Sequence, residues 1–176
     1  MGRYRFGVSA AAILTTALLL TACGGNGDGT GSEESIEVTT SQTPVAQAVE
    51  VEPKVAETLR GTTTDPGLNV EWTYQGTRSG QYSGSVVTFL VRNLNDEPVP
   101  PESIPDPKLQ YNSGGGTMTD ATPLSNSDTE LNLGLDLPLG AGASTNIQYA
   151  FEVSPGNLWD AELQVGNVIF EGNLSY

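Results

Sequence analysis

The sequence has no histidine and a single cysteine, Cys23. Because histidine is the commonest general base and the commonest zinc ligand, its absence removes the usual residues of a hydrolase or a zinc site. A lone cysteine also excludes an intramolecular disulfide, so a folded domain must depend on its hydrophobic core. No G-x-S-x-G or S-x-x-K motif supplies an activated serine. We therefore expect a protein that is not an enzyme and needs no cofactor.

Basic residues are scarce too, with 7 Lys and Arg against 21 Asp and Glu and a formal net charge of −14. Nucleic acids and anionic lipid headgroups would repel such a chain. The charge therefore excludes a nucleic-acid partner, and repulsion between copies favours a monomer.

Long hydrophobic runs are limited to one, from about Phe6 to Leu20, which follows Arg3 and Arg5. This run is shorter than the roughly 20 apolar residues that a membrane-spanning helix needs. A positive start, a short apolar run and small residues before Cys23 are typical of a signal peptide, here predicted over residues 1–22.

Leu20, Thr21 and Ala22 stand directly before Cys23, and this sequence resembles the lipobox of bacterial lipoproteins. The resemblance implies cleavage before Cys23 and a diacylglyceryl group, with fatty acids such as palmitate, on its thiol. Two acyl chains hold a protein stably on a membrane, whereas one is marginal. The implied location is the extracytoplasmic face of the cell membrane. The alternative is an ordinary secreted protein with a cysteine near its cleavage site by chance.

Residues 23–64 are low in aromatic residues and rich in Gly, Ser and acidic side chains, especially Gly24–Ser35. Pro44 and Pro53 interrupt any helix. Such a composition predicts a flexible acidic tether between Cys23 and a domain over residues 65–176.

Alternating apolar and polar residues begin after residue 65 and predict short β-strands. Residues typical of turns and loops separate these strands. They predict a type II turn at Ser154–Asn157 and a proline-rich loop at Asn93–Pro107. About seven strands in this order predict an antiparallel, immunoglobulin-like β-sandwich. The expected strands centre on residues 70–74, 87–91, 109–111, 131–137, 147–153, 159–165 and 168–170.

A second resemblance covers roughly residues 68–171. The segments SVVTFLVRN (85–93), LGAG (139–142) and QYAFEV (148–153), with a proline-rich loop after the first, resemble the telokin-like DUF4352 domains of bacterial lipoproteins. The resemblance implies an immunoglobulin-like sandwich outside the cytoplasm, and it supplies no catalytic residues.

Carboxylates offer the remaining candidate sites. Asp160 and Glu162 lie two apart on a predicted strand and share one face, while Asp96 and Glu97 lie in the Asn93–Pro107 loop with Glu102 and Asp106. Oxygen ligands of this kind suit Ca²⁺, but no EF-hand spacing is present. A solvated strand face and an ordinary polar loop explain the same residues, so we predict no metal site.

The aromatic residues Trp72, Tyr74, Tyr149, Phe151 and Trp159 fall on the apolar side of predicted strands. This position favours burial in the core over a carbohydrate-binding platform. The pattern does not assign Tyr82 and Tyr111 to the core, and their side chains could be exposed.

These features predict a lipid-anchored, extracytoplasmic, non-catalytic binding or adaptor module of the cell envelope. Its contact surface would be a sheet edge or the Asn93–Pro107 loop, because loops on a rigid sandwich commonly carry recognition. The alternative is a lipoprotein that binds a small ligand or a metal ion, which requires a sizeable apolar pocket or converging carboxylates. An envelope antigen without a dedicated partner is a third possibility.

Overall fold

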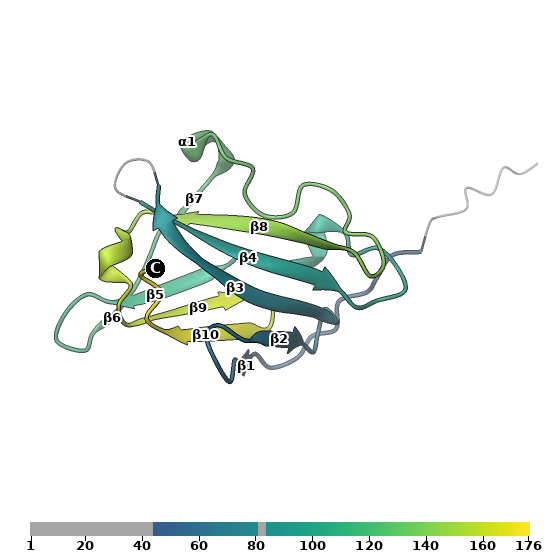
Figure 1. Cartoon of the computed structure of the whole chain (residues 1–176), viewed down its shortest axis with the longest axis horizontal. Helices are drawn as coiled ribbons and strands as arrows, with labels where there is room; N and C mark the ends of the chain where they lie inside the picture. Colours follow the sequence, from purple (N-terminus) through teal and green to yellow (C-terminus); the bar gives the residue numbers. More distant parts are fainter. Residues whose placement is uncertain (1–43, 81–83) are drawn as a thin grey trace, which may run out of the picture. The chain divides into compact units, whose positions relative to one another are not determined.

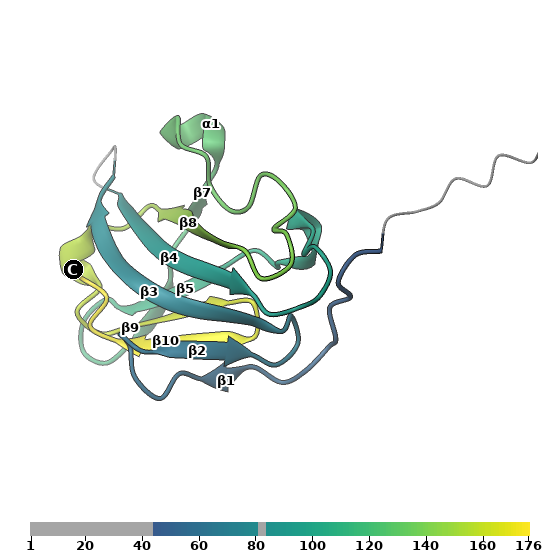
Figure 2. The ribbon, with the colours of Figure 1, turned by 45° about the vertical axis from the view of Figure 1, so that its right-hand side comes forward.

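A computed structural model of the protein describes residues 44–80 and 84–176, and this part of the chain is almost entirely β-structure. Ten strands in it form two five-stranded sheets. Figure 1 and Figure 2 show β3, β4 and β8 in one layer and β5, β9 and β10 in the other. The all-β prediction is confirmed. The predicted signal peptide, lipobox, Cys23 and most of the tether lie outside the described residues, as does Tyr82.

The first sheet is antiparallel throughout, in the order β2-β3-β4-β8-β7. Its centre consists of long strands rich in β-branched and aromatic residues, which suit a pleated surface buried on one side. Its edge strands β2 and β7 are short, and β7 begins with a proline. The bounds are β2 Thr62–Asp65, β3 Val70–Ser79, β4 Ser85–Asn93, β8 Ser144–Phe151 and β7 Pro123–Leu124.

The second sheet has the order β1-β10-β9-β5-β6, and only its β1–β10 pair is parallel. The chain passes from β6 in this sheet to β7 in the other within three residues, so one edge of the sandwich is a crossover. The bounds are β1 Lys54–Val55, β10 Val168–Gly172, β9 Ala161–Val165, β5 Lys108–Asn112 and β6 Met118–Asp120.

Helical structure is limited, in the part described, to three short segments: η2 Pro101–Ser103, α1 Asn126–Thr129 and η3 Pro155–Asn157. Over the same residues, no helix combines the length and hydropathy that a membrane crossing requires.

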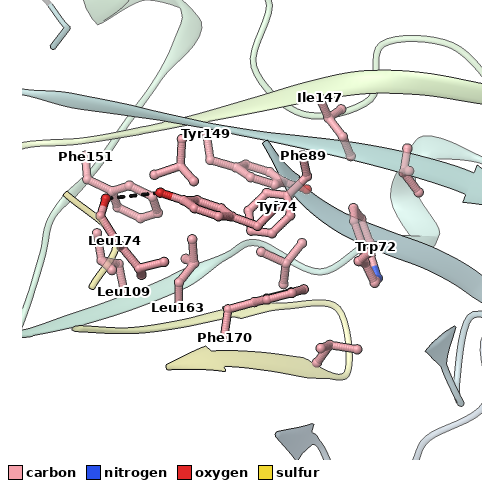
Figure 3. Packing of buried hydrophobic residues seen from close by; sticks show 14 of the residues in the cluster. Trp72, Tyr74, Phe89, Leu109, Ile147, Tyr149, Phe151, Leu163, Phe170 and Leu174 are labelled. Carbon is pink, nitrogen blue, oxygen red and sulfur yellow. Dashed lines mark hydrogen bonds between the residues drawn. The ribbon is translucent and has the colours of Figure 1, made fainter. Parts of the chain in front are cut away.

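The core lies between the two sheets, and Phe89 of β4 is at its centre. Its ring contacts Trp72 and Tyr74 edge-on, with centroids 6.1 and 5.7 Å away. It also meets Phe170 of the opposite sheet at 4.9 Å. Figure 3 shows these rings stacked between the layers. Such pairs add about 0.5–1.5 kcal/mol each beyond the apolar area that they bury.

A fully buried carboxylate, Asp65, joins the two sheets at one edge. From the end of β2 it accepts hydrogen bonds from the Gly67 and Leu68 amides at 2.9 and 3.0 Å and from the Trp72 indole at 3.3 Å. It also accepts bonds from the backbone and side-chain nitrogens of Asn167, in the β9–β10 turn, at 2.8 and 2.9 Å. These bonds satisfy a buried charge that has no cationic partner in the part of the chain described.

The predicted strand at 131–137 is wrong. These residues form an irregular loop, in which Gly134 has a φ of 72° and Leu137 is 68% exposed. A left-handed backbone at Gly134 ends any extended run. The leucines do alternate, but the segment forms no ladder with a neighbouring strand; its Gly134 amide alone is seen to donate to β8, at the Gln148 carbonyl.

The predicted burial of Trp159 is also wrong, because its side chain is 54% exposed. The residues before it form the 3₁₀ helix η3 instead of a type II turn, and Leu158 fills the core position, fully buried. The Leu158 carbonyl accepts a hydrogen bond from the Leu174 amide at 2.8 Å. Strand β9 then begins at Ala161. Trp72, Tyr74, Tyr149 and Phe151 are buried as predicted.

Ordered structure begins well before the predicted boundary at residue 65. Ala46 is buried and its amide donates to the Pro98 carbonyl at 2.9 Å. Lys54–Val55 pairs with β10, and Thr62–Asp65 is an edge strand. The boundary was placed too late because the prediction depended on alternating apolar residues. These segments are polar and short, and they bury backbone and small side chains instead.

Replacing Asp65 with alanine should lower the free energy of unfolding by about 3–5 kcal/mol, because several buried donors lose their acceptor. Asp65→Asn keeps part of the acceptor capacity, so its free energy of unfolding should lie between those of the unmodified protein and Asp65→Ala. Urea denaturation followed by tryptophan fluorescence measures the change. The exposed Asp96→Ala serves as control, with an expected effect within about 0.5 kcal/mol. An equally small effect for Asp65→Ala would show that the carboxylate does not hold the sheets together.

Candidate functional site

A cavity of about 660 Å³ lies at the crossover edge of the sandwich, between β7, β8 and the residues that lead into β5. This volume is within the range of small-molecule sites, roughly 300–1,000 Å³. Most of its wall is apolar. The residues that matter for its chemistry are Asp106, Pro107, Leu124, Leu133, Tyr149 and Ala150.

One wall is a tightly bonded segment around α1. The Asp128 carboxylate accepts the Ser125 hydroxyl and amide at 2.6 and 2.9 Å, which lowers the pKa of Asp128. The carboxylate therefore stays charged, and holds this turn, at pH values below those at which an ordinary aspartate would be protonated. The Leu133 amide donates to the Asn126 side chain at 3.2 Å, and the Gly134 amide donates to the Gln148 carbonyl of β8 at 2.8 Å. Of the leucines expected to form a strand, Leu133 lines the cavity, next to Gly134, whose amide attaches this segment to β8.

Tyr149 lines the cavity from β8, and it is 6% exposed. Its hydroxyl is buried and has no hydrogen-bond partner among the described residues. Burial raises the pKa of Tyr149, and the negative charge of Asp106 raises it further. The hydroxyl therefore keeps its proton at physiological pH and is a hydrogen-bond donor without an acceptor.

Tyr74 shows how the same fold treats a buried tyrosine in the core. Its hydroxyl lies 3.1 Å from the Leu174 carbonyl and 3.0 Å from the Tyr176 carbonyl, and 2.8 Å from the Thr77 hydroxyl. Figure 3 shows the bond to Leu174 and the different direction taken by Tyr149. The two buried tyrosines therefore differ in whether the hydroxyl has a hydrogen-bond partner. The other buried side-chain oxygen without a partner in the described part, Ser85 Oγ, does not line this cavity.

Comparison with family models, curated proteins and solved structures finds no match for this chain. The site must be argued from its own geometry.

The carboxylates considered from the sequence are spread over the domain. Asp96 and Glu97 are exposed, and Asp160 accepts a hydrogen bond from the Asn112 side chain at 2.8 Å. Glu162 faces Gln110 across β5 and β9. No three metal-ligating side chains converge within residues 44–80 and 84–176. Of the acidic residues in the Asn93–Pro107 loop, only Asp106 lines the 660 Å³ cavity.

The Asn93–Pro107 loop itself is fixed at its base by Asn93. The buried side chain of Asn93 donates to the carbonyls of Glu97, Leu139 and Gly140 at 2.8–3.0 Å. Its oxygen accepts the amide of Asn95 at 2.8 Å. The loop therefore presents its exposed acids from a fixed frame.

Sequence reasoning placed Tyr149 in the core and missed its part in a cavity wall. The alternation Ile147, Tyr149, Phe151 shows which side chains face inward, but it does not show which hydroxyl finds a partner. No local signal in the sequence joins Tyr149 to Asp106, because the two residues lie in separate segments that only the fold brings to one cavity.

Replacing Tyr149 with phenylalanine should leave the ligand-free protein equally stable or make it more stable, by up to about 1–2 kcal/mol, because an unpaired buried hydroxyl is removed. The matched variant Tyr74→Phe should cost about 1 kcal/mol, because it removes a paired hydroxyl. Urea denaturation of both variants measures the difference. A Tyr149→Phe protein destabilised as much as Tyr74→Phe would mean that the Tyr149 hydroxyl is satisfied in solution.

Proposed function

We propose that this chain is a lipid-anchored, non-catalytic binding protein on the extracytoplasmic face of a bacterial cell membrane, and that it binds a small organic molecule. The lipobox-like residues Leu20–Cys23 support the anchor and the location. The ligand is supported by one observation, the mostly apolar cavity of about 660 Å³ between β7, β8 and the residues that lead into β5.

The size and the lining of this cavity favour a small organic ligand. Its volume lies within the roughly 300–1,000 Å³ of small-molecule sites, and most of its wall is apolar. A buried apolar contact with Leu124, Leu133 and Ala150 would supply the binding energy.

We further propose that the sandwich is of the immunoglobulin-like, DUF4352 type. The segments 85–93, 139–142 and 148–153 carry this resemblance, and an all-β chain in two antiparallel layers is compatible with it. The net charge after removal of residues 1–22 would be −16, since Arg3 and Arg5 are lost with that segment. Such a charge keeps the domain away from anionic headgroups and leaves the cavity open to the surrounding space.

A second candidate is an adaptor that binds an envelope protein through the Asn93–Pro107 loop. The observation in its favour is the frame of hydrogen bonds around Asn93, which holds the exposed Asp96 and Glu97 in a fixed arrangement. Rigidly presented loops commonly carry recognition.

The anchor is tested by Cys23→Ser. This variant should no longer incorporate labelled palmitate and should move from the membrane fraction to the soluble fraction outside the cytoplasm. Cell fractionation with immunoblotting measures the shift, and the unmodified chain is the control. Retention of Cys23→Ser in the membrane fraction would contradict a lipid anchor at this residue.

The ligand is tested by purifying the lipidated full chain from its own membranes and analysing what denaturation releases. One small organic molecule per chain should appear by mass spectrometry, and it should be lost in Leu133→Trp, which fills the cavity from an irregular loop. Trp159→Ala, on an exposed residue outside the cavity, is the control. The opposite outcome is that no small molecule is released, that crosslinking captures one protein, and that Asp96→Ala and Glu97→Ala abolish this crosslink. The adaptor function then replaces this proposal.

A further inference from the structure

Strand β8 has an open side. Its ladder with β4 runs along the whole strand, but on the other side β7 pairs with only two of its residues. Over Ser144–Gln148, the one backbone hydrogen bond that the described residues make on that side is from the Gly134 amide to the Gln148 carbonyl, at 2.8 Å. Backbone groups point to alternate sides of a strand, so those of Asn146 and the Gln148 amide lie on the open side. Ser144–Gln148 contains no charged residue and no proline, the usual protections of an open edge.

The chain carries a segment of matching length beside this edge. Residues 134–138 lie between two attachments, the Gly134 amide on β8 and the isolated pairing of Leu139 with Val99. An antiparallel ladder that continues from the present Gly134 bond would set these five residues opposite the five of Ser144–Gln148, without a slip in register. Figure 1 and Figure 2 show the chain passing β8 after α1, before it turns back into that strand.

The alternation of leucines fits the same register. Leu135 would stand opposite Ile147 and Leu137 opposite Thr145, on the side of β8 that faces the core. Leu135 already packs against the core, whereas Leu137 is 68% exposed. Pairing would therefore remove Leu137 from solvent and leave Asp136 on the outer face, which is the favourable arrangement for both side chains.

Gly134 keeps the segment out of this ladder. Its φ of 72° lies in the left-handed region, so the chain turns away directly after the bond to β8. A Cβ at Gly134 would meet no atom within 4 Å, so the backbone conformation, and not the available space, is what a side chain would disturb. An extended Gly134 would also redirect the preceding Leu133, which lines the 660 Å³ cavity.

We propose that residues 134–138 are a lid with two conformations, the irregular loop and a strand that pairs with β8 beside β7. In the strand form the Asp136 amide donates to the Asn146 carbonyl, and the Asn146 and Gln148 amides donate to the carbonyls of Asp136 and Gly134. Because closing moves Leu133, the wall of the cavity differs between the two forms. The lid is a property of the chain itself and does not depend on the proposed ligand.

Hydrogen exchange of the detergent-solubilised full chain, resolved to single amides by mass spectrometry with electron-transfer fragmentation, tests the lid. Gly134→Val should slow exchange of the Asn146 and Gln148 amides about fivefold or more, because valine disfavours the left-handed loop and favours a strand. Gly134→Asn is the matched control, because asparagine tolerates the left-handed backbone, and exchange should stay within about twofold of the unmodified protein. The amides of Thr145 and Ile147, which face β4, should not change.

Pairs of cysteines give a second measurement. Leu137→Cys with Thr145→Cys sets two thiols side by side in the strand form. With oxidised glutathione this pair should form a disulfide about fivefold or more faster than Asp136→Cys with Thr145→Cys, whose side chains would lie on opposite faces. Mass spectrometry of proteolytic peptides identifies the bond and separates it from any reaction of Cys23.

Slower exchange in Gly134→Val together with a preference for the disulfide between positions 137 and 145 supports the lid. Unchanged exchange in Gly134→Val, slowing of the same size in Gly134→Asn, or equal rates for the two cysteine pairs overturns it. None of these results alters the co-purification test, so failure of the lid leaves the proposed ligand standing, and absence of a ligand leaves the lid standing.

Discussion

The buried carboxylate of Asp65 joins the two layers of this sandwich, and within the described residues its partners are hydrogen-bond donors and no cation. Asp65 takes donors from its own turn, from the Trp72 indole and from Asn167 in the opposite sheet. The turn that supplies Asn167 must come very close, and Gly166 makes this possible. A Cβ at Gly166 would collide with Asp65 Oδ2, and its φ of +57° is one that residues with side chains rarely adopt. Carboxylate, glycine and asparagine therefore form one unit.

The opposite edge of the sandwich is built differently. There the chain crosses from β6 to β7, β7 pairs with only two residues of β8, and a loop attached through Gly134 covers part of what remains. A stable frame at one edge and along the Phe89-centred core allows the other edge to hold a cavity and an unpaired hydroxyl.

The sequence predicted the central strands and the inward residues Trp72, Tyr74, Tyr149 and Phe151, because large apolar side chains at every second position have one good solution, a half-buried strand. The prediction failed where an alternating segment has no partner strand in the fold. The leucines at 131–137 alternate in a loop, and Trp159 lost its core position to Leu158 when the preceding turn became helical. The early strands at 54–55 and 62–65 are held by backbone bonds and by Asp65, which leave little trace in hydrophobic periodicity. The cavity combines Asp106, Leu133 and Tyr149 from three separate segments, so its existence follows only from the fold.

The first described segment also bears on mechanics. Residues 44–61 are fastened by few bonds, among them the Ala46 amide to Pro98, the Val49 amide to Gly67 and the two-residue pairing of β1 with β10. Under tension applied from the N-terminal side, as anchoring at Cys23 would produce, these bonds are loaded one after another, while Asp65 protects everything that follows. Peeled away and fully stretched, this segment would be about 60 Å long, at roughly 3.3–3.6 Å per residue, part of which it already spans in the fold. A chain anchored at Cys23 would therefore be expected to lengthen first through residues 44–61, ahead of the strands that carry the cavity.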